Sequence, residues 1–201
     1  MTRAWRLEDA EAHLLSLELF GMRFGLERMR RLLIALGSPH ERFRAIHVVG
    51  TNGKSSTVRF TAALLEAHGV RTGSFLSPHL TSFAERIRIG DSDLEPDAFG
   101  AAVQRAAAAK VDRTLPGGER VTQFELVTAA AFDALADRGV EVAVVEAGLG
   151  GPPSEIVRDP RAALERAREL AGADGAVLAT GSIYLVADLL AAPGARRASA
   201  L

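Results

Sequence analysis

The sequence predicts an α/β fold, in which a parallel sheet is flanked by helices and carries a phosphate-binding loop. Short apolar runs alternate along the chain with longer segments of helical periodicity, which is typical of strands joined by crossover helices. The run Val142–Val145 is uninterrupted and apolar, as expected for a strand buried on both faces. A glycine-flanked turn at residues 50–56 directly follows another short apolar run, which is how phosphate loops are placed.

In the first half of the chain, apolar spacing and stop signals delimit the expected elements. Leu7–Leu19 and Leu26–Leu36 have the spacing of amphipathic helices, and Gly37-Ser38-Pro39 ends the second one. The apolar run Ile46–Val49 predicts the first strand. Ser56–Ala67 has an apolar face and a glycine shortly after its end, so it is the expected crossover helix.

The second half of the chain continues this alternation. Arg71–Leu76 predicts a second strand, and Glu85–Ile89, in which charged and apolar residues alternate, predicts an exposed strand. Helical spacing recurs in Pro96–Lys110 and Thr122–Arg138, which are separated by a loop rich in proline and glycine. The buried strand Val142–Val145 then completes the pattern.

Composition limits the classes of function. A chain of 201 residues with 48% apolar residues can bury a sizeable core, as one large domain or one domain plus a fragment. The formal net charge of -1 argues against a surface for nucleic acid, and the absence of cysteine excludes disulfides, zinc-thiolate sites and thiol catalysis. No signal peptide is visible, and the apolar stretch Ile183–Ala192 is too short to span a bilayer. We therefore expect a soluble, cytoplasmic protein.

The turn after the first expected strand has the chemistry of a phosphate cradle. Gly50 and Gly53 let the backbone approach a polyphosphate closely, while Lys54 and the N-terminus of the next helix supply positive potential. The spacing G-x-x-G-K-S is shorter than the standard loop, so this is a variant, and an ordinary turn with an exposed lysine is the alternative. The expected ligand is a nucleoside triphosphate, and the residues predicted to bind it are Gly50, Thr51, Asn52, Gly53, Lys54, Ser55 and Ser56.

Two expected strands are followed by candidate metal ligands. Ser77 and His79 come after the second strand, at the edge where open α/β sheets bind ligands. Ser77 is a candidate ligand of Mg²⁺ and His79 a candidate for orienting substrate, whereas a capped proline turn is the alternative. Glu146 ends the buried strand, where a carboxylate without a cation is costly, and this favours a magnesium ligand over a carboxylate satisfied by hydrogen bonds.

The segment Thr122, Gln123, Phe124 and Glu125 opens an expected helix. The spacing of Thr122 and Glu125 fits a capping box, in which each side chain accepts a hydrogen bond from the backbone of the other residue. A contact to substrate is the alternative. On spacing alone, the capping box is favoured.

Four segments carry a resemblance to a known family, namely Leu19–Arg28, Gly50–Ser56, Ser77–Leu80 with Phe83–Ile87, and Val145–Gly151. Together and in this order they resemble folylpolyglutamate synthase and its bifunctional dihydrofolate synthase form. These enzymes belong to the Mur ligase superfamily of ATP-dependent, amide-forming enzymes. The match runs from about residue 10 to Gly151. One departure is Ser55, because this family usually has glycine there.

The resemblance implies a ligase that adds glutamate to folate or to dihydropteroate. The γ-phosphoryl group of ATP would pass to a carboxylate of the substrate, and the amine of L-glutamate would attack the acyl phosphate. By the match, Lys54 and Glu146 are the candidate catalytic residues, and Ser77 with Glu146 would hold Mg²⁺. Thr122–Glu125 correspond to residues that line the pterin site in the family, and His79 joins them as a candidate substrate contact. The expected partners are these small molecules, without nucleic acid or membrane, and the family suggests a monomer.

The end of the chain departs from the family. After Gly151 the continuation of the ATPase domain is missing, and the segment from Asp159 onward resembles the extreme C-terminal end of the family, with a helix over Pro160–Ala171 and a strand over Ala176–Thr180. The family's later metal-binding histidine, its modified lysine and its adenine contacts have no counterpart. We therefore expect an incomplete Mur ligase-like ATP-binding domain at residues 1–151, a junction at 152–159 and a helix-strand-helix remnant of the C-terminal domain at 160–201.

Two other hypotheses stay open. The chain could be an inactive remnant that binds nucleotide weakly, or another Mur ligase that acts on a cell-wall precursor, although residues 24–28 and 77–80 speak against the latter. Missing strands would also leave an apolar edge and an uncovered face near Val142–Val145. In that case residues 152–159 should be irregular, the tail should dock loosely, and the isolated protein should aggregate.

Overall fold

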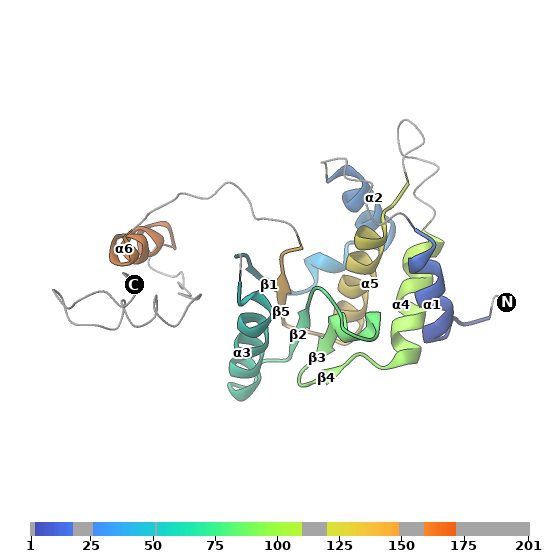
Figure 1. Cartoon of the computed structure of the whole chain (residues 1–201), viewed down its shortest axis with the longest axis horizontal. Helices are drawn as coiled ribbons and strands as arrows, with labels where there is room; N and C mark the ends of the chain where they lie inside the picture. Colours follow the sequence, from blue (N-terminus) through green and yellow to red (C-terminus); the bar gives the residue numbers. More distant parts are fainter. Residues whose placement is uncertain (1–2, 18–25, 51, 110–119, 149–158, 172–201) are drawn as a thin grey trace.

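The computed structural model describes residues 3–17, 26–50, 52–109, 120–148 and 159–171. A five-stranded sheet lies at its centre, and helices cover both faces (Figure 1). Its strands are β1 (Arg44–Val48), β2 (Thr72–Phe75), β3 (Ile87–Ile89), β4 (Ser92–Asp93) and β5 (Val142–Glu146), arranged in the order β1-β5-β2-β3-β4.

The sheet is parallel only in part, which corrects the prediction of a parallel sheet. β1, β5 and β2 run parallel, whereas β3 and β4 are antiparallel to their neighbours. The connection from β2 to β3 holds only a short 3-10 helix, η2 (Phe83–Arg86). A parallel return needs a longer crossover, usually an α-helix, so this short connection leads to an antiparallel neighbour.

Helices lie in two layers. α3 (Lys54–Ala67) covers one face of the sheet, and α1, α4 and α5 pack together on the other face, with α2 against α5 (Figure 1). The helix α6 stands apart from the sheet in the same view. The remaining bounds are α1 (Leu7–Leu15), α2 (Glu27–Ala35), η1 (Pro39–Glu41), α4 (Pro96–Ala108), α5 (Gln123–Asp137) and α6 (Pro160–Ala171).

The predicted elements are recovered with shifted ends. α3 begins at Lys54, two residues earlier than expected, so the lysine and Ser55 lie in the first helical turn. α6 confirms the helix over Pro160–Ala171. The expected strand Ala176–Thr180 and the junction at residues 152–158 lie outside the described residues.

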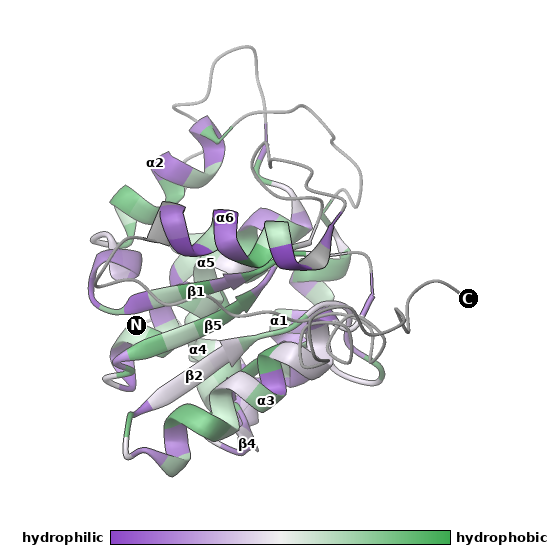
Figure 2. Ribbon diagram, turned by 90° about the vertical axis from the view of Figure 1, so that its left-hand side faces the viewer, coloured by the Kyte–Doolittle hydropathy of each residue, from purple (hydrophilic) through white to green (hydrophobic). Residues whose placement is uncertain are grey.

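β5 is an interior strand of the sheet, as its apolar run predicts. Ala143 and Val144 are fully buried, and Figure 2 shows β5 between β1 and β2. Two apolar clusters fill the layers on either side: one between the sheet and α1, α4 and α5, and a smaller one beneath α3 that includes Val58. Because β5 has a partner on both sides, the prediction of an uncovered edge near Val142–Val145 is wrong.

The open edge lies at β1 instead. Among the described strands β1 pairs only with β5, and most of its residues are exposed. Phe60 and Leu64, one helical turn apart on α3, also expose most of their side chains. Chains commonly associate through unpaired strand edges and exposed apolar surfaces. If the protein aggregates as predicted, we therefore expect β1 and α3 to form the contacts.

The strand predicted at residues 85–89 is found as β3 (Ile87–Ile89), but it is not exposed, and residues 83–86 form the 3-10 helix η2. Ile87 is fully buried, lies opposite Phe75 in β2 and belongs to the core cluster beneath α4 and α5. The alternation of charged and apolar residues indicated the strand but did not reveal how far it is buried.

We expect Gly73→Ala to lower the free energy of unfolding by about 1–3 kcal/mol, the usual cost of overpacking a core. A β-carbon on Gly73 would lie 2.4 Å from Leu135 Cδ2 and 3.2 Å from the carbonyl oxygen of Arg88, and Leu135 is fully buried. Urea denaturation measures the effect. The double variant with Leu135→Val, which shortens the colliding side chain, should recover part of the loss; equal midpoints for Gly73→Ala and the parent would contradict the argument.

Candidate functional site

The predicted phosphate loop joins the edge strand β1 to the N-terminus of α3. Gly53 caps the helix with a φ of 73°, a left-handed conformation that glycine adopts without strain. The first turn of a helix has backbone N–H groups without partners inside the helix, and its dipole favours anions. Lys54, Ser55 and Ser56 lie in this turn. Gly50 and Asn52 are exposed beside it, whereas Thr51 lies outside the described residues.

Glu146 lies where three elements meet. The residue is 4% exposed, and among the described residues its carboxylate accepts hydrogen bonds from Ser55 Oγ on α3 at 2.8 Å and from the backbone N–H of Ser77 after β2 at 3.2 Å. The parallel register pairs Phe75 with Val145, which confirms that the ends of β2 and β5 are neighbours. The two predicted metal ligands are therefore close together. The contact from Ser55 was not foreseen, although Ser55 follows the lysine directly, where phosphate loops place a metal-binding hydroxyl.

The residues around Glu146 fit a magnesium ion shared with a phosphate ligand. Both hydrogen bonds to the carboxylate come from serine residues, and no described ion pair involves Glu146. No group of three His, Cys, Asp or Glu side chains suited to a metal occurs in the described part of the chain. Magnesium suits such a donor set, because it commonly takes one or two carboxylates and completes its shell with water and substrate phosphates.

His79 lies after β2, as predicted, and contacts Arg86 and Phe83. Arg86 Nε donates to His79 Nδ1 at 2.9 Å, and the rings of His79 and Phe83 have centroids 4.2 Å apart. Burial, and then the charge of Arg86, lower the pKa of His79. Sequence reasoning assigned Arg86 to an exposed strand and so missed its contact with His79.

The segment Thr122–Glu125 forms the capping box that its spacing favours. Thr122 Oγ1 accepts from the N–H of Glu125 at 3.3 Å, and Glu125 accepts from the N–H of Thr122 at 2.9 Å. Glu125 also pairs with Arg28 at 2.9 Å, and Gln123 Nε2 donates to the carbonyl oxygen of Leu14. Three of these four side chains thus have partners within the protein.

Phe124 is the member of this segment that presents a surface. Its side chain is partly exposed, and its ring lies against Gly148, where a β-carbon would approach Phe124 Cζ to 2.5 Å. Gly148 follows Glu146 by two residues, so Phe124 lies at the same edge of the sheet as the candidate metal ligands. Gly150 and Gly151 lie outside the described residues.

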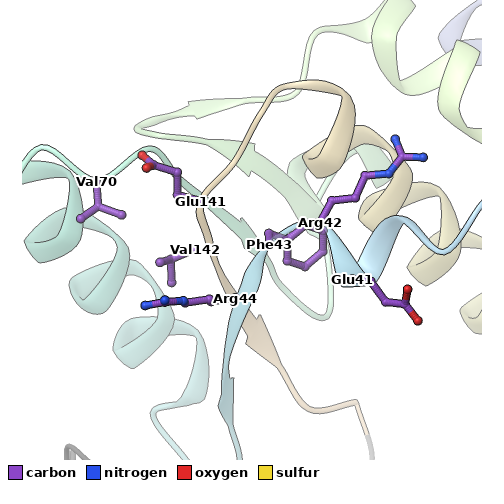
Figure 3. Close-up of a pocket in the computed structure, with 7 residues that line it drawn as sticks. All are labelled: Glu41, Arg42, Phe43, Arg44, Val70, Glu141 and Val142. Carbon is purple, nitrogen blue, oxygen red and sulfur yellow. The ribbon is translucent and has the colours of Figure 1, made fainter. Parts of the chain in front are cut away.

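A depression lies at the end of the sheet opposite to Glu146 (Figure 3). It has a volume of about 610 Å³ and is lined by residues at the amino ends of β1 and β5, including Arg44 and Val142. None of the predicted site residues lines it. Open α/β sheets bind ligands at the carboxyl ends of their strands, so the edge around Glu146 is the candidate functional site.

Comparison with curated proteins finds relatives of one kind. The chain is 40% identical over 143 residues to a probable bifunctional folylpolyglutamate synthase/dihydropteroate synthase of Haloferax volcanii, a match that covers 71% of this chain and 17% of that protein. It is 38% identical over 135 residues to the dihydrofolate synthase/folylpolyglutamate synthase of Bacillus subtilis, covering 66% of this chain and 31% of that protein. This chain therefore spans about a third or less of the length of these two relatives. No protein-family model matches the chain.

Solved structures agree with the sequence relatives. Mycobacterium tuberculosis folylpolyglutamate synthase complexed with ADP is 38% identical, with a TM-score of 0.67 over 72% of this chain and 32% of that one. A folylpolyglutamate synthase complex with AMPPCP and folate is 36% identical, with a TM-score of 0.67 over 73% of this chain and 36% of that one. Over about 70% of its length, this chain is homologous in sequence and fold to the folylpolyglutamate and dihydrofolate synthases, which are ATP-dependent ligases.

Proposed function

We propose that the chain binds magnesium and ATP at the edge around Glu146, as part of a ligase that adds L-glutamate to folate or dihydropteroate. One observation carries the proposal: a buried carboxylate without a described cationic partner lies against the first turn of α3, beside a phosphate-type loop. A cation bound there would offset the cost of burying the charge. Relatives that bind ADP, AMPPCP and folate support the same assignment.

In this reaction the protein mainly positions the reacting groups and neutralises the charge of the phosphates. A carboxylate oxygen of the substrate attacks the γ-phosphorus of ATP, and ADP leaves with the electrons of the broken P–O bond. The amine of glutamate then attacks the acyl carbon, phosphate leaves, and the amine loses a proton. Magnesium, when bound, would offset the charge of the phosphates. Glu146 and Ser77 would hold it, and Lys54 would compensate the β- and γ-phosphate oxygens.

The substrate side of the proposal rests on Phe124 and His79. Both lie at the edge of the sheet that carries Glu146, and Phe124 offers a partly exposed aromatic ring on which a flat heterocycle could stack. Thr122, Gln123 and Glu125 support this ring from the start of α5. We take the protein to act as a cytoplasmic monomer. None of the helices in the described part of the chain has the length and apolar character needed to cross a bilayer.

A second candidate function is an inactive remnant with weak nucleotide binding. The chain covers 31% of the Bacillus subtilis relative, so most of that protein's length is not matched here. The proposed division is an incomplete ATP-binding domain at residues 1–151, a junction at 152–159 and a C-terminal remnant at 160–201. In this reading phosphate binding survives while ligation is lost.

We expect magnesium to strengthen binding of AMPPCP by the parent protein, and Glu146→Gln to remove that gain while preserving the fold. Glutamine keeps the acceptor oxygen but lacks the charge that attracts the metal. Calorimetric titrations with AMPPCP, in magnesium or in EDTA, measure both effects. Glu141→Gln, an exposed carboxylate at the other end of β5, is the matched control. Equal magnesium dependence in the parent and Glu146→Gln would remove Glu146 from the site.

Turnover separates the two candidate functions. The remnant hypothesis predicts magnesium-dependent nucleotide binding without release of ADP when folate or dihydropteroate and L-glutamate are added. Glutamate-dependent ADP release from this chain would establish the ligase and exclude the remnant.

A further inference from the structure

Arg86 is a largely buried cation that has no carboxylate partner among the described residues. Its residue is 9% exposed, Nε donates to His79 Nδ1 at 2.9 Å, and the guanidinium carbon lies 5.1 Å from the centre of the Phe83 ring. No described residue accepts a hydrogen bond from Nη1 or Nη2, and no described ion pair includes Arg86. Arg28 is equally buried but pairs with Glu125. Nη1 and Nη2 of Arg86 are not among the described buried atoms that lack a hydrogen-bond partner, so they reach solvent and are open to a ligand.

The imidazole beside Arg86 does not neutralise it. A guanidinium only donates hydrogen bonds, so Nδ1 of His79 must be the acceptor and its proton must reside on Nε2. His79 is therefore a neutral ring that offers a further N–H donor. Burial lowers the pKa of Arg86. The pair thus presents several N–H donors and one positive charge.

The loop that carries this pair is held in place. The Glu85 carboxylate accepts from the backbone N–H groups of Leu80, Thr81 and Ser82 at 2.8–3.0 Å. Glu11 of α1 accepts from the hydroxyl of Ser82 and from the N–H of the next residue at 2.8 and 3.0 Å. At the other end, the N–H of Leu76 donates to the carbonyl oxygen of Arg86 at 2.8 Å. Donors fixed in this way lose little freedom when a ligand binds.

The position of Arg86 relative to Glu146 limits what it can bind. β2 lies between β5 and β3, so Arg86 is about two strand spacings, or roughly 10 Å, from the end of β5 along the same edge of the sheet. The phosphate loop follows β1, one strand farther, so the backbones of Arg86 and the loop are about three strand spacings, or roughly 14 Å, apart. We infer that a carboxylate at Arg86 is not the one that is phosphorylated. It belongs to a part of the substrate that the reaction leaves intact.

We propose that Arg86 and His79 form a binding site for a carboxylate that the reaction does not consume. The planar guanidinium fork matches the two oxygens of a carboxylate, and the N–H of His79 adds a donor beside it. The inference rests on the proposed ligase function, in which the ligands that carry spare carboxylates are L-glutamate and a folate that already has a glutamyl group. The shared chemistry is the carboxylate, and titration of each ligand distinguishes the two sources.

The test uses Arg86→Met and Arg86→Lys in the full chain. Calorimetric titrations with L-glutamate, pteroylglutamate and pteroate measure binding, because the only carboxylate of pteroate is the one that would react. Loss of a charged hydrogen-bonding partner typically weakens binding about tenfold to a hundredfold. We expect Arg86→Met to lose that much affinity for L-glutamate or for pteroylglutamate, and to bind pteroate as the parent does. Arg86→Lys should fall between, since it keeps the charge without the fork.

Two further measurements separate binding from a structural role. The exposed Arg59→Met on α3 is the matched control and should change none of these affinities. Without ligand, Arg86→Met should melt close to the temperature of the parent, because Arg86 makes no ion pair with a described residue. Unchanged affinity of Arg86→Met for both glutamate-containing ligands would overturn the proposal. Binding of AMPPCP, measured in the same variants, tests the proposed function separately. If the proposed function is wrong, the parent protein does not bind AMPPCP. If only the carboxylate site is wrong, the parent and Arg86→Met both bind AMPPCP.

Discussion

Replacing Glu125 with alanine is expected to lower the free energy of unfolding by about 3–5 kcal/mol, the usual cost of removing one partner of a buried ion pair. The side chains of Arg28 and Glu125 are 8% and 14% exposed and lie 2.9 Å apart, joining α2 to α5. The alanine variant would remove the carboxylate that pairs with the buried Arg28 guanidinium and would also open the capping box at the start of α5. Small domains are stable by only about 5–15 kcal/mol, so a loss of this size should be obvious in urea denaturation.

A matched control is available on the same helix α2. Glu27 and Arg31 form an exposed pair one turn apart, and such pairs contribute only about 0.3–0.5 kcal/mol. Glu27→Ala should therefore unfold almost as the parent does. Adding Arg28→Met to Glu125→Ala should recover part of the loss by removing the buried charge that Glu125 no longer compensates. If Glu125→Ala and Glu27→Ala had the same midpoint, the Arg28 pair would not support the fold.

Replacing Lys54 with alanine is expected to abolish detectable nucleotide binding. Lys54 is the first residue of α3, and the backbone N–H groups of the loop and helix carry only partial charge. Without the lysine, the β- and γ-phosphate oxygens stay under-compensated. A hydrogen bond to a charged group contributes about 1.5–3 kcal/mol, or roughly 10- to 150-fold in affinity, which suffices to remove weak binding.

Titration calorimetry with AMPPCP and magnesium measures the loss, and thermal melting checks that the variant folds. Arg59→Ala, an exposed cation farther along the same helix, is the control and should bind as the parent does. Equal affinities for Lys54→Ala and the parent would show that Lys54 takes no part in binding.

The sequence predicts well those features that depend on neighbours along the chain. The apolar run Val142–Val145 predicts an interior strand, because a strand that is apolar throughout is typically covered on both faces. The Thr122/Glu125 spacing predicts the capping box because both partners lie within one helical turn. The pairing of the strand ends beside Ser77 and Glu146 also follows, since parallel strands bring their carboxyl ends to one edge.

Features that depend on distant segments could not be predicted in this way. The antiparallel direction of β3 follows from a connection too short for a crossover helix. The local pattern at residues 85–89 does not indicate which elements pack against the two faces of this strand. The contact of Ser55 with Glu146 joins positions 91 residues apart. Arg86 gives no sign of burial in sequence, because an arginine in a run where charged and apolar residues alternate is equally typical of an exposed strand.

The position of β1 at the edge of the sheet also bears on motion. Among the described strands, β1 has a ladder on one side only, so its opening disrupts fewer hydrogen bonds than the opening of β5 would. Segments of this kind open at low free energy, and their backbone amides exchange with solvent soonest. The phosphate loop extends from this strand, so a ligand held by the loop would also slow the opening of β1. Part of the free energy of binding would then be used to order β1, and the measured affinity would be lower by that amount.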